Sequence, residues 1–212
     1  MNHNGIGGVN DMNQNVTLIG KTIKLLPLES KHKEDLLETL MDPNIWEFTW
    51  RKNATFDDIK HLIEQAIQNQ LHGTQLPFVI VELMSEKIIG TTRIGDIDMI
   101  NQNAEIGWTW LTPTYWRTGV NTECKFLLLN YCFEQLALVR VQFSISGYNI
   151  RSQRAIERIG ATKEGIFRKH RRDTQGRFHD NVFYSITDND WPEVKSTLKH
   201  MIHIKYSPKN TR

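Results

Sequence analysis

Residues 108–160, WTWLTPTYWRTGVNTECKFLLLNYCFEQLALVRVQFSISGYNIRSQRAIERIG, decide the fold of this chain. They read as the end of a strand (104–111), a glycine loop (116–121), an amphipathic helix (121–136), a second strand (139–146) and a helix ending at Gly160. A glycine loop between a strand and a helix N-terminus favours phosphate, because its backbone N–H groups lack acceptors and the helix dipole attracts negative charge. The stretch therefore predicts a phosphorylated cofactor and, with it, an enzyme.

The amino-acid composition limits the classes of protein to which the chain can belong. The 212 residues are 39% apolar and 24% charged, which is typical of a globular domain with a substantial core. A formal net charge of +2 argues against a nucleic-acid binder, and no segment reaches the roughly 18 apolar residues of a membrane span. We expect a flexible leader over residues 1–18, one domain over 19–205 and a tail over 206–212.

Two cysteines, Cys124 and Cys132, fall on the same predicted helix. Eight helical residues separate their backbones by about 12 Å, which is too far for a disulfide. Two free thiols without an export signal favour a reducing cytoplasm. No histidine lies at a spacing that would activate Cys124, so we expect both thiols to be buried in the core.

The rest of the chain alternates strands and helices without internal repeats. We expect strands at 21–28, 78–83, 88–94 and 104–111, helices at 30–40 and from Thr55 to about residue 72, and a hairpin of 161–172 with 177–187 before a last helix. Thr55 with Asp58 is the pattern of a helix capping box. Alternation in the strand 104–111 places Ile106, Trp108 and Trp110 on one face and Glu105, Gly107 and Thr109 on the other.

Four segments of this pattern, at residues 104–111, 115–123, 149–152 and 157–161, together resemble the GNAT superfamily of N-acetyltransferases. The resemblance is closest to its RimJ/RimL-like branch, which includes ribosomal-protein N-terminal acetyltransferases. It implies an α/β (α+β) fold in one domain, with a central mixed, mostly antiparallel twisted sheet flanked by helices. By analogy with this branch a homodimer is an option.

The resemblance implies acetyl-CoA as co-substrate and no metal. In the family the loop wraps the CoA pyrophosphate, and the matching residues here are Trp116, Arg117, Thr118, Gly119, Val120, Asn121 and Thr122. The strand edge at Trp110, Leu111 and Thr112 matches the edge that pairs with the pantetheine arm, and Asn149 matches a further cofactor contact. A linear ligand with amide groups suits an open strand edge, and its phosphates suit a helix start.

Two positions depart from the family pattern. The loop has Trp116 first and Asn121 last where the family usually has Gln or Arg and then Gly or Ala. Asn tolerates a positive φ better than most residues, so we expect the loop to keep its shape. Ile156 replaces the tyrosine that many members use to protonate the departing thiolate. Ser152, one turn earlier, matches the RimJ/RimL-like branch and becomes the candidate donor.

Acetyl transfer to an amine requires a base, because an ordinary amine is mostly protonated near neutrality. Glu105 is our candidate for the general base, since it lies a few residues before the cofactor edge. Its structural alternative is a polar strand residue or a partner of Arg93, and Asp180 on the hairpin is a rival base. The alternative for Ser152 is a small residue that lets helices pack closely.

Two further groups of side chains have open interpretations. Trp46, Phe48 and Trp50 either line the acceptor pocket or fill the core, and we expect two of the three in the core. The basic residues 168–172 and Arg177 are either a solvated face or a surface for an acidic acceptor, ribosomal RNA or the CoA 3′-phosphate.

The sequence thus predicts a cytoplasmic acetyl-CoA-dependent N-acetyltransferase that works by direct transfer in a ternary complex. The acceptor is a primary amine, either a protein N-terminus or a small molecule. The alternative is a catalytically silent acyl-CoA-binding or RNA-associated module that keeps the fold. The eight scattered histidines support no metal site.

Overall fold

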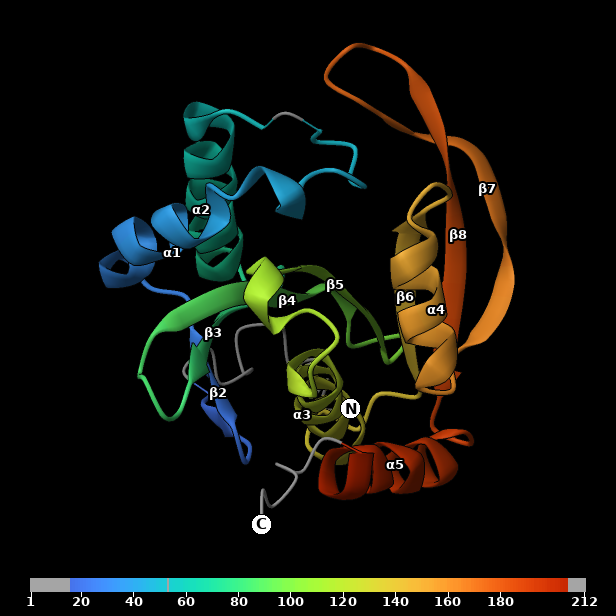
Figure 1. Cartoon of the computed structure of the whole chain (residues 1–212). Helices are drawn as coiled ribbons and strands as arrows, with labels where there is room; N and C mark the ends of the chain where they lie inside the picture. Colours follow the sequence, from blue (N-terminus) through green and yellow to red (C-terminus); the bar gives the residue numbers. More distant parts are fainter. Residues whose placement is uncertain (1–15, 53, 206–212) are drawn as a thin grey trace, which may run out of the picture.

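A computed structural model describes residues 16–52 and 54–205, and they form one sheet with helices packed on it (Figure 1). The eight strands are ordered β1-β2-β3-β4-β5-β6-β8-β7. Every neighbouring pair is antiparallel except β5 with β6, which is parallel. The predicted single mixed α/β domain with a mostly antiparallel sheet is confirmed.

The elements follow the predicted order along the chain. The strands are β1 Leu18–Ile19, β2 Ile23–Pro27, β3 Gln75–Glu82, β4 Ile88–Asp98, β5 Asn103–Leu111, β6 Arg140–Ser146, β7 Thr162–Arg172 and β8 Phe178–Thr187. The helices are α1 Lys33–Leu40, α2 Phe56–Leu71, α3 Val120–Glu134, α4 Ile150–Arg158 and α5 Trp191–His200. Most of the predicted leader and the whole predicted tail lie outside the described residues, while Leu18 already belongs to β1.

Two hydrophobic clusters divide the core between the faces of the sheet. On one face α1 packs against β4 and α2 against β3, with Leu36, Ile59 and Val79 among the buried residues. On the other face α3, α4 and α5 form the larger cluster, which contains both cysteines as buried free thiols. Figure 1 shows α1 and α2 beside the β2–β4 side of the sheet and α4 beside β6 and β8. The predicted capping box of α2 is present, since Thr55 and Asp58 bond each other's backbone N–H.

The predicted alternation along β5 is wrong beyond its middle. Three steps of β5, from Gly107 to Trp110, oppose two steps of β4, and Trp108 has a φ of 49°. This β-bulge adds one residue, which turns every later side chain to the opposite face. Trp110 therefore leaves the face of Ile106 and packs on Trp46 of the α1–α2 cluster, with ring centroids 5.0 Å apart.

The parallel pairing of β5 with β6 is short. It joins only residues 103–105 to residues 140–142, after which β6 continues along β8 as far as Ser146. Within the described residues, the edge of β5 from Ile106 to Leu111 has no strand partner on the β6 side. The sheet therefore offers an open strand edge at its centre.

A buried carboxylate joins α3 to the start of the sheet. Glu123 accepts hydrogen bonds from the backbone N–H groups of Lys21 and Thr22 and from the Thr22 hydroxyl. Its side chain occupies the space where a Cβ at Gly20 would lie, so a larger residue there would displace the Glu123 carboxylate. This contact fixes the helix that follows the glycine loop against β2.

Replacing Glu123 with Gln is expected to lower the free energy of unfolding by about 1.5–3 kcal/mol, the usual range for hydrogen bonds to a charged group. The amide would direct its N–H donors at N–H groups that need an acceptor. Urea denaturation followed by circular dichroism measures this change. Glu38→Gln, at an exposed position of α1, is the matched control, and an equal effect in both variants would contradict the anchoring role.

Candidate active site

Glu105 lies at the last position of β5 that pairs with β6. Its side chain is 6% exposed, and its Oε2 accepts a hydrogen bond of 3.2 Å from Gln142 Nε2 on β6. Ile106 belongs to the cluster on the α3 face of the sheet. Its neighbour Glu105 therefore points to the other face, as the alternation along the strand predicted. The hydrogen-bond partner of the carboxylate is Gln142 rather than Arg93.

Burial raises the pKa of the Glu105 carboxyl from its usual value to about 7. The Gln142 hydrogen bond and the positive charges of Arg171 and Lys125 lower the pKa, and the charge of Asp96 raises it. Desolvation is the largest of these effects. Near neutral pH the group is thus divided between acid and carboxylate, which suits a residue that exchanges protons.

A cleft of about 330 Å³ opens beside Glu105, between β4, β6 and the β7–β8 hairpin. Phe167 and Phe183 form an aromatic wall, with ring centroids 4.1 Å apart. Arg140 and Glu164 at its rim neutralise each other through two hydrogen bonds of 2.6 Å. The cleft can therefore receive a small or narrow ligand directly against the Glu105 carboxyl.

Asp180, the rival base, is engaged in the hairpin itself. Its Oδ1 accepts a hydrogen bond of 2.8 Å from the backbone N–H of Lys169. Lys169 has a φ of 50° and lies in an irregular stretch of the β7–β8 pairing. The carboxylate therefore stabilises this irregular backbone, and Asp180 is not among the residues that line the cleft.

The glycine loop passes directly into α3. The helix begins at Val120 with Gly119 as its N-cap, so Asn121 already lies in the first turn. The positive φ of the loop is at Arg117, 62°, so Asn121 need not adopt one. Trp116 Nε1 donates to the Leu111 carbonyl over 2.9 Å, which folds the loop back onto β5. The N–H groups of Asn121 and Thr122 have no acceptor within the helix and so suit an anion.

The N-terminus of α4 meets this loop. Asn149 caps the helix, with its Oδ1 accepting from the Ser152 N–H over 3.0 Å. Arg151, which we did not single out from the sequence, lies with its guanidinium carbon 3.8 Å from the centroid of the Trp116 ring. This cation–π contact brings the segment with Asn149 and Ser152 beside the glycine loop.

Lys125 on α3 is a second residue that we missed in the sequence. It is 4% exposed, its Nζ donates to Thr109 Oγ1 over 2.8 Å, and the same atom lies 5.8 Å from the Phe143 ring centroid. The ammonium therefore lies between β5 and β6 where the strands part, and burial lowers its pKa. Helix α3 packs against both the sheet and α5, so a charged residue on it need not face solvent.

The predictions for the three aromatic residues at 46, 48 and 50 and for the strand edge at 110–112 are met only in part. Trp46 is in the core, but Trp50 is half-buried and Phe48 is 39% exposed, so one aromatic rather than two fills the core. The side chains of Trp110 and Leu111 pack into opposite clusters, while the Thr112 N–H bonds the Ile89 carbonyl on the β4 side.

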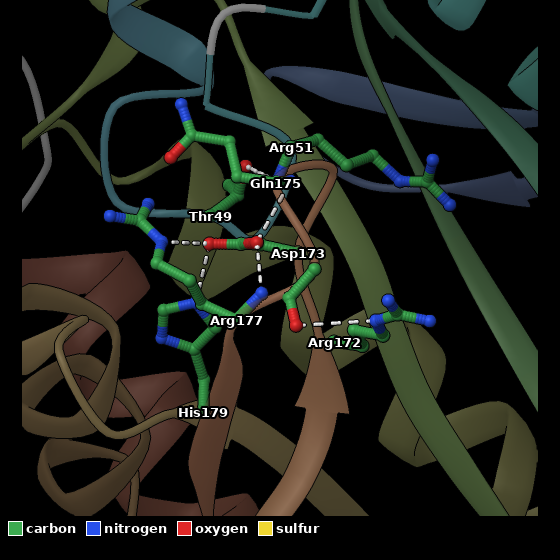
Figure 2. Close-up of polar contacts among 8 residues, drawn as sticks. Thr49, Arg51, Arg172, Asp173, Gln175, Arg177 and His179 are labelled. Atoms are coloured by element: carbon green, nitrogen blue, oxygen red, sulfur yellow. Dashed lines mark hydrogen bonds and ion pairs between the residues drawn. The ribbon is translucent and has the colours of Figure 1, made fainter.

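The basic hairpin is exposed along β7, and an acidic residue organises its turn. Figure 2 shows Asp173 accepting hydrogen bonds from the side chains of Arg177 and His179, at 2.8 and 2.7 Å. The His179 contact and the bonds from Arg177 and Gln175 hold the pKa of Asp173 well below its usual value. Part of the basic run is therefore neutralised locally, and Arg171 and His170 are the members that line the cleft.

Two classes of feature are missing from the part of the chain that the structure describes. It contains no group of three or more His, Cys, Asp or Glu side chains that could hold a metal ion. None of its helices is long and apolar enough to cross a membrane.

Comparison with known proteins identifies relatives across most of the chain. Residues 22–162 match the family described as "Acetyltransferase (GNAT) domain". The "Putative ribosomal N-acetyltransferase YdaF" of Bacillus subtilis (strain 168) is 32% identical, over 82% of this chain and 94% of its own. A GCN5-related N-acetyltransferase from Brucella melitensis has a similar structure, with a TM-score of 0.82, 26% identity and coverage of 93% and 90%. Mycobacterium smegmatis RimJ in complex with CoA-disulfide shares the fold, with a TM-score of 0.74, 19% identity and coverage of 91% and 96%.

The raised pKa of Glu105 predicts a pH-dependent cost in stability. A carboxyl of pKa about 7 in the folded state and 4.5 in the unfolded state binds more protons when folded. Stability is therefore lost as the pH rises from 4.5 to 7, by about 3 kcal/mol in total. Glu105→Gln has no such group, so its stability should increase relative to the natural protein between pH 4.5 and pH 8. Denaturant unfolding at both pH values measures this, and an unchanged difference would contradict the raised pKa.

Proposed function

The chain belongs to the acetyltransferase (GNAT) family, and on that basis we propose that it acetylates a primary amine by direct transfer from acetyl-CoA in a ternary complex. The observation that carries the proposal is the buried Glu105 carboxyl, with a pKa near 7, at the point where β5 and β6 part. The adjacent cleft gives an amine access to it. The relatives agree with the predicted family, and one with a ribosomal name agrees with the RimJ/RimL-like branch.

The open edge of β5 and the start of α3 fit acetyl-CoA, which supplies an acyl group activated as a thioester. The edge that ends at Trp110, Leu111 and Thr112 leaves backbone groups for the amides of the pantetheine arm. The pyrophosphate suits the loop and first turn, formed by Trp116, Arg117, Thr118, Gly119, Val120, Asn121 and Thr122. Asn149 and Ser152 approach the same region from α4, held there by the contact of Arg151 with Trp116.

Glu105 and Ser152 act on different reacting groups, the acceptor amine and the leaving sulfur. Glu105 in its carboxylate form removes a proton from the acceptor ammonium, because the neutral amine is the nucleophile. Ser152 Oγ donates a hydrogen bond to the sulfur that leaves as a thiolate. A backbone N–H of the β5 edge stabilises the negative charge that develops on the carbonyl oxygen.

The thiols of the chain support direct transfer rather than an acetylated cysteine. Cys124 and Cys132 are both buried, and burial raises the pKa of Cys124 to about 11 and that of Cys132 further. A thiol must be ionised and accessible to act as a nucleophile. Two reduced thiols also agree with a cytoplasmic location.

A silent cofactor-binding module is the second candidate. Ile156 occupies the position where many family members have the donor tyrosine, and its side chain is buried in the core. Catalysis therefore depends on whether Ser152 performs that role.

The direct test is release of free CoA thiol from acetyl-CoA across a panel of amines and N-terminal peptides, with a no-acceptor control. We expect acceptor-dependent release, and we expect Glu105→Gln and Ser152→Ala each to lower kcat at least about tenfold, as loss of general acid–base residues commonly does. Glu38→Gln and Ser196→Ala, at exposed positions, are the matched controls. Turnover equal to the natural protein in both test variants would refute the assigned roles. Binding of acetyl-CoA without turnover of any amine would favour the silent module.

Lys125→Met is expected to move the pH profile of kcat/KM. The positive charge of Lys125 lowers the pKa of Glu105, so its removal raises that pKa. The base then ionises at higher pH, and activity falls more at pH 6.5 than at pH 8.5. Lys199→Met, which removes an exposed charge from α5, should leave the profile in place. An unshifted profile in Lys125→Met would show that the two groups do not interact.

A further inference from the structure

Three aromatic side chains, Phe167, His170 and Phe183, line the cleft of about 330 Å³ beside Glu105, and we call them the ring cluster. The ring centroids of Phe167 and Phe183 are 4.1 Å apart, and the His170 ring meets both of them edge-on, at 5.6 and 5.2 Å. Burial and the charge of Arg171 lower the pKa of His170, so its ring is mostly neutral near neutral pH. The ring cluster therefore presents one continuous aromatic surface to the cleft.

This surface is open to solvent rather than packed in the core. Phe167 is 53% exposed. Phe167 and His170 also line a second hollow of about 660 Å³, together with Arg168 and Lys169. A ligand can therefore reach the rings from outside the molecule, and covering them removes apolar surface from water, which favours binding.

Gly165 keeps the space in front of Phe183 open. It lies directly opposite Phe183 in the β7–β8 pair and lines the same cleft. A Cβ at this position would meet no atom within 4 Å. The φ of Gly165 is not positive, so the backbone does not require glycine there. What glycine provides at this position is room beside the ring.

An irregular stretch of β7 brings His170 into the ring cluster. In a regular strand Phe167 would share its face with residues 169 and 171. Here the four steps from Phe167 to Arg171 oppose two steps of β8, and Lys169 has a φ of 50°. Asp180 Oδ1 holds this backbone by accepting from the Lys169 N–H over 2.8 Å. Bulges re-aim side chains and are frequent beside active sites, so Asp180 is a positioning residue for the ring cluster.

The charges of the cleft suit a cation. Asp96 and Glu164 line it together with Glu105. Glu164 is neutralised by two hydrogen bonds of 2.6 Å from Arg140. Among the described residues no cation forms an ion pair with Asp96 or Glu105. These unpaired carboxyl groups favour the ammonium group of an approaching amine.

We propose that the ring cluster selects an acceptor whose amine is joined by a short chain to an aromatic ring, with Phe167, His170 and Phe183 as the specificity-determining residues. The identification of this ligand as the acceptor rests on the proposed function. The ring of the ligand packs on the cluster while its amine faces Glu105. The cleft lies at the lower end of the range of about 300–1,000 Å³ for small-molecule sites. Stacked and edge-on contacts between aromatic rings add to the gain from burying their area.

Binding of simple amines tests the ring cluster without catalysis. The full chain is titrated by calorimetry with phenethylamine, ethylamine and 2-cyclohexylethylamine, once without cofactor and once with CoA, so that no acetyl group is present. We expect phenethylamine to bind at least about tenfold more tightly than ethylamine, because its ring is buried. It should also bind at least about threefold more tightly than the cyclohexyl compound, which lacks a π face. Equal binding of phenethylamine and either of the other amines under both conditions would overturn the proposal.

Variants of two exposed phenylalanines separate the ring cluster from general surface apolarity. Phe167→Leu should reduce the preference for phenethylamine over 2-cyclohexylethylamine to about unity. Phe178→Leu should keep the preference, because Phe178 is a 60% exposed residue of β8 that does not line the cleft. Full retention of the preference in Phe167→Leu would contradict the assignment.

Filling the cleft is a second, independent test. Gly165→Leu places a side chain in the open space beside Phe183 and should weaken binding of phenethylamine at least about threefold more than binding of ethylamine. The change meets no backbone obstacle, so circular dichroism should show the natural fold. Unchanged binding of phenethylamine would show that the ring lies elsewhere and would refute the proposal.

Kinetics of Asp180 variants distinguish positioning from proton transfer. Asp180→Ala should raise the KM for phenethylamine at least about threefold and leave the KM for ethylamine unchanged, because only the ring cluster is displaced. Asp180→Asn should restore the natural KM, since its amide oxygen still accepts from the Lys169 N–H. If Asp180 were the general base, Asp180→Asn would instead lower kcat for both amines. An unchanged KM in Asp180→Ala would contradict the positioning role.

Turnover then links the ring cluster to the acceptor. Phenethylamine should exceed ethylamine at least about tenfold in kcat/KM, and Phe167→Leu should reduce this ratio through KM rather than kcat. If amines with and without a ring are acetylated equally well, this inference fails and the proposed function stands. If phenethylamine binds as expected but no amine or N-terminal peptide releases thiol, the acetyltransferase assignment fails and the ring cluster stands as a binding site for aromatic amines.

Discussion

The short parallel contact between β5 and β6 is the constraint on which the rest of the site depends. The two strands share three residue pairs and then part, because β6 follows β8 while β5 follows β4 through a bulge at Trp108. A bulge increases the local twist of its strand and re-aims the side chains beyond it. The result is an open strand edge at the centre of a sheet whose faces are otherwise well packed. Glu105 lies at the junction, which explains both its burial and its access to a cleft.

Buried charge is concentrated around this junction, and each buried group is on a different element. Glu105 on β5, Lys125 on α3 and Arg93 on β4 all have pKa values shifted towards neutrality by desolvation. Lys125 lies on the α3 face of the sheet and Arg93 on the α2 face, so each face carries a buried cation next to the strand that holds Glu105. Such groups reduce the stability of a fold, and their clustering beside an open edge is typical of a functional site.

The positions of α4, the glycine loop and α3 around the open edge of β5 depend on contacts between elements that are distant in sequence. Helix α4 is attached to β6, and its N-terminus reaches the glycine loop through Arg151 and Trp116. The loop is tied to β5 through the Trp116 indole, and α3 is tied to β2 through Glu123. The loop, strand edge and helix start that we propose bind acetyl-CoA are therefore held by separate anchors.

The sequence by itself determined the features that are local. The order of strands and helices, the capping of α2 by Thr55 and Asp58, the cap at Asn149 and the burial of both cysteines follow from residue type and spacing within one or two turns. The family followed from the same segments read in order, and the face of Glu105 followed from alternation before the bulge.

Only the tertiary structure decided the features that depend on long-range contacts. The extra residue in the bulge at Trp108 turned the Trp110 side chain to the opposite face of the sheet. The hydrophobic pattern of β5 does not reveal such a bulge, because a bulge exists only relative to the residues of the paired strand β4. The burial of Lys125 and Arg93 and the stacking of Arg151 on Trp116 were likewise beyond the sequence. Whether a charged side chain faces water or protein depends on which elements pack against it, and that is settled when the sheet assembles.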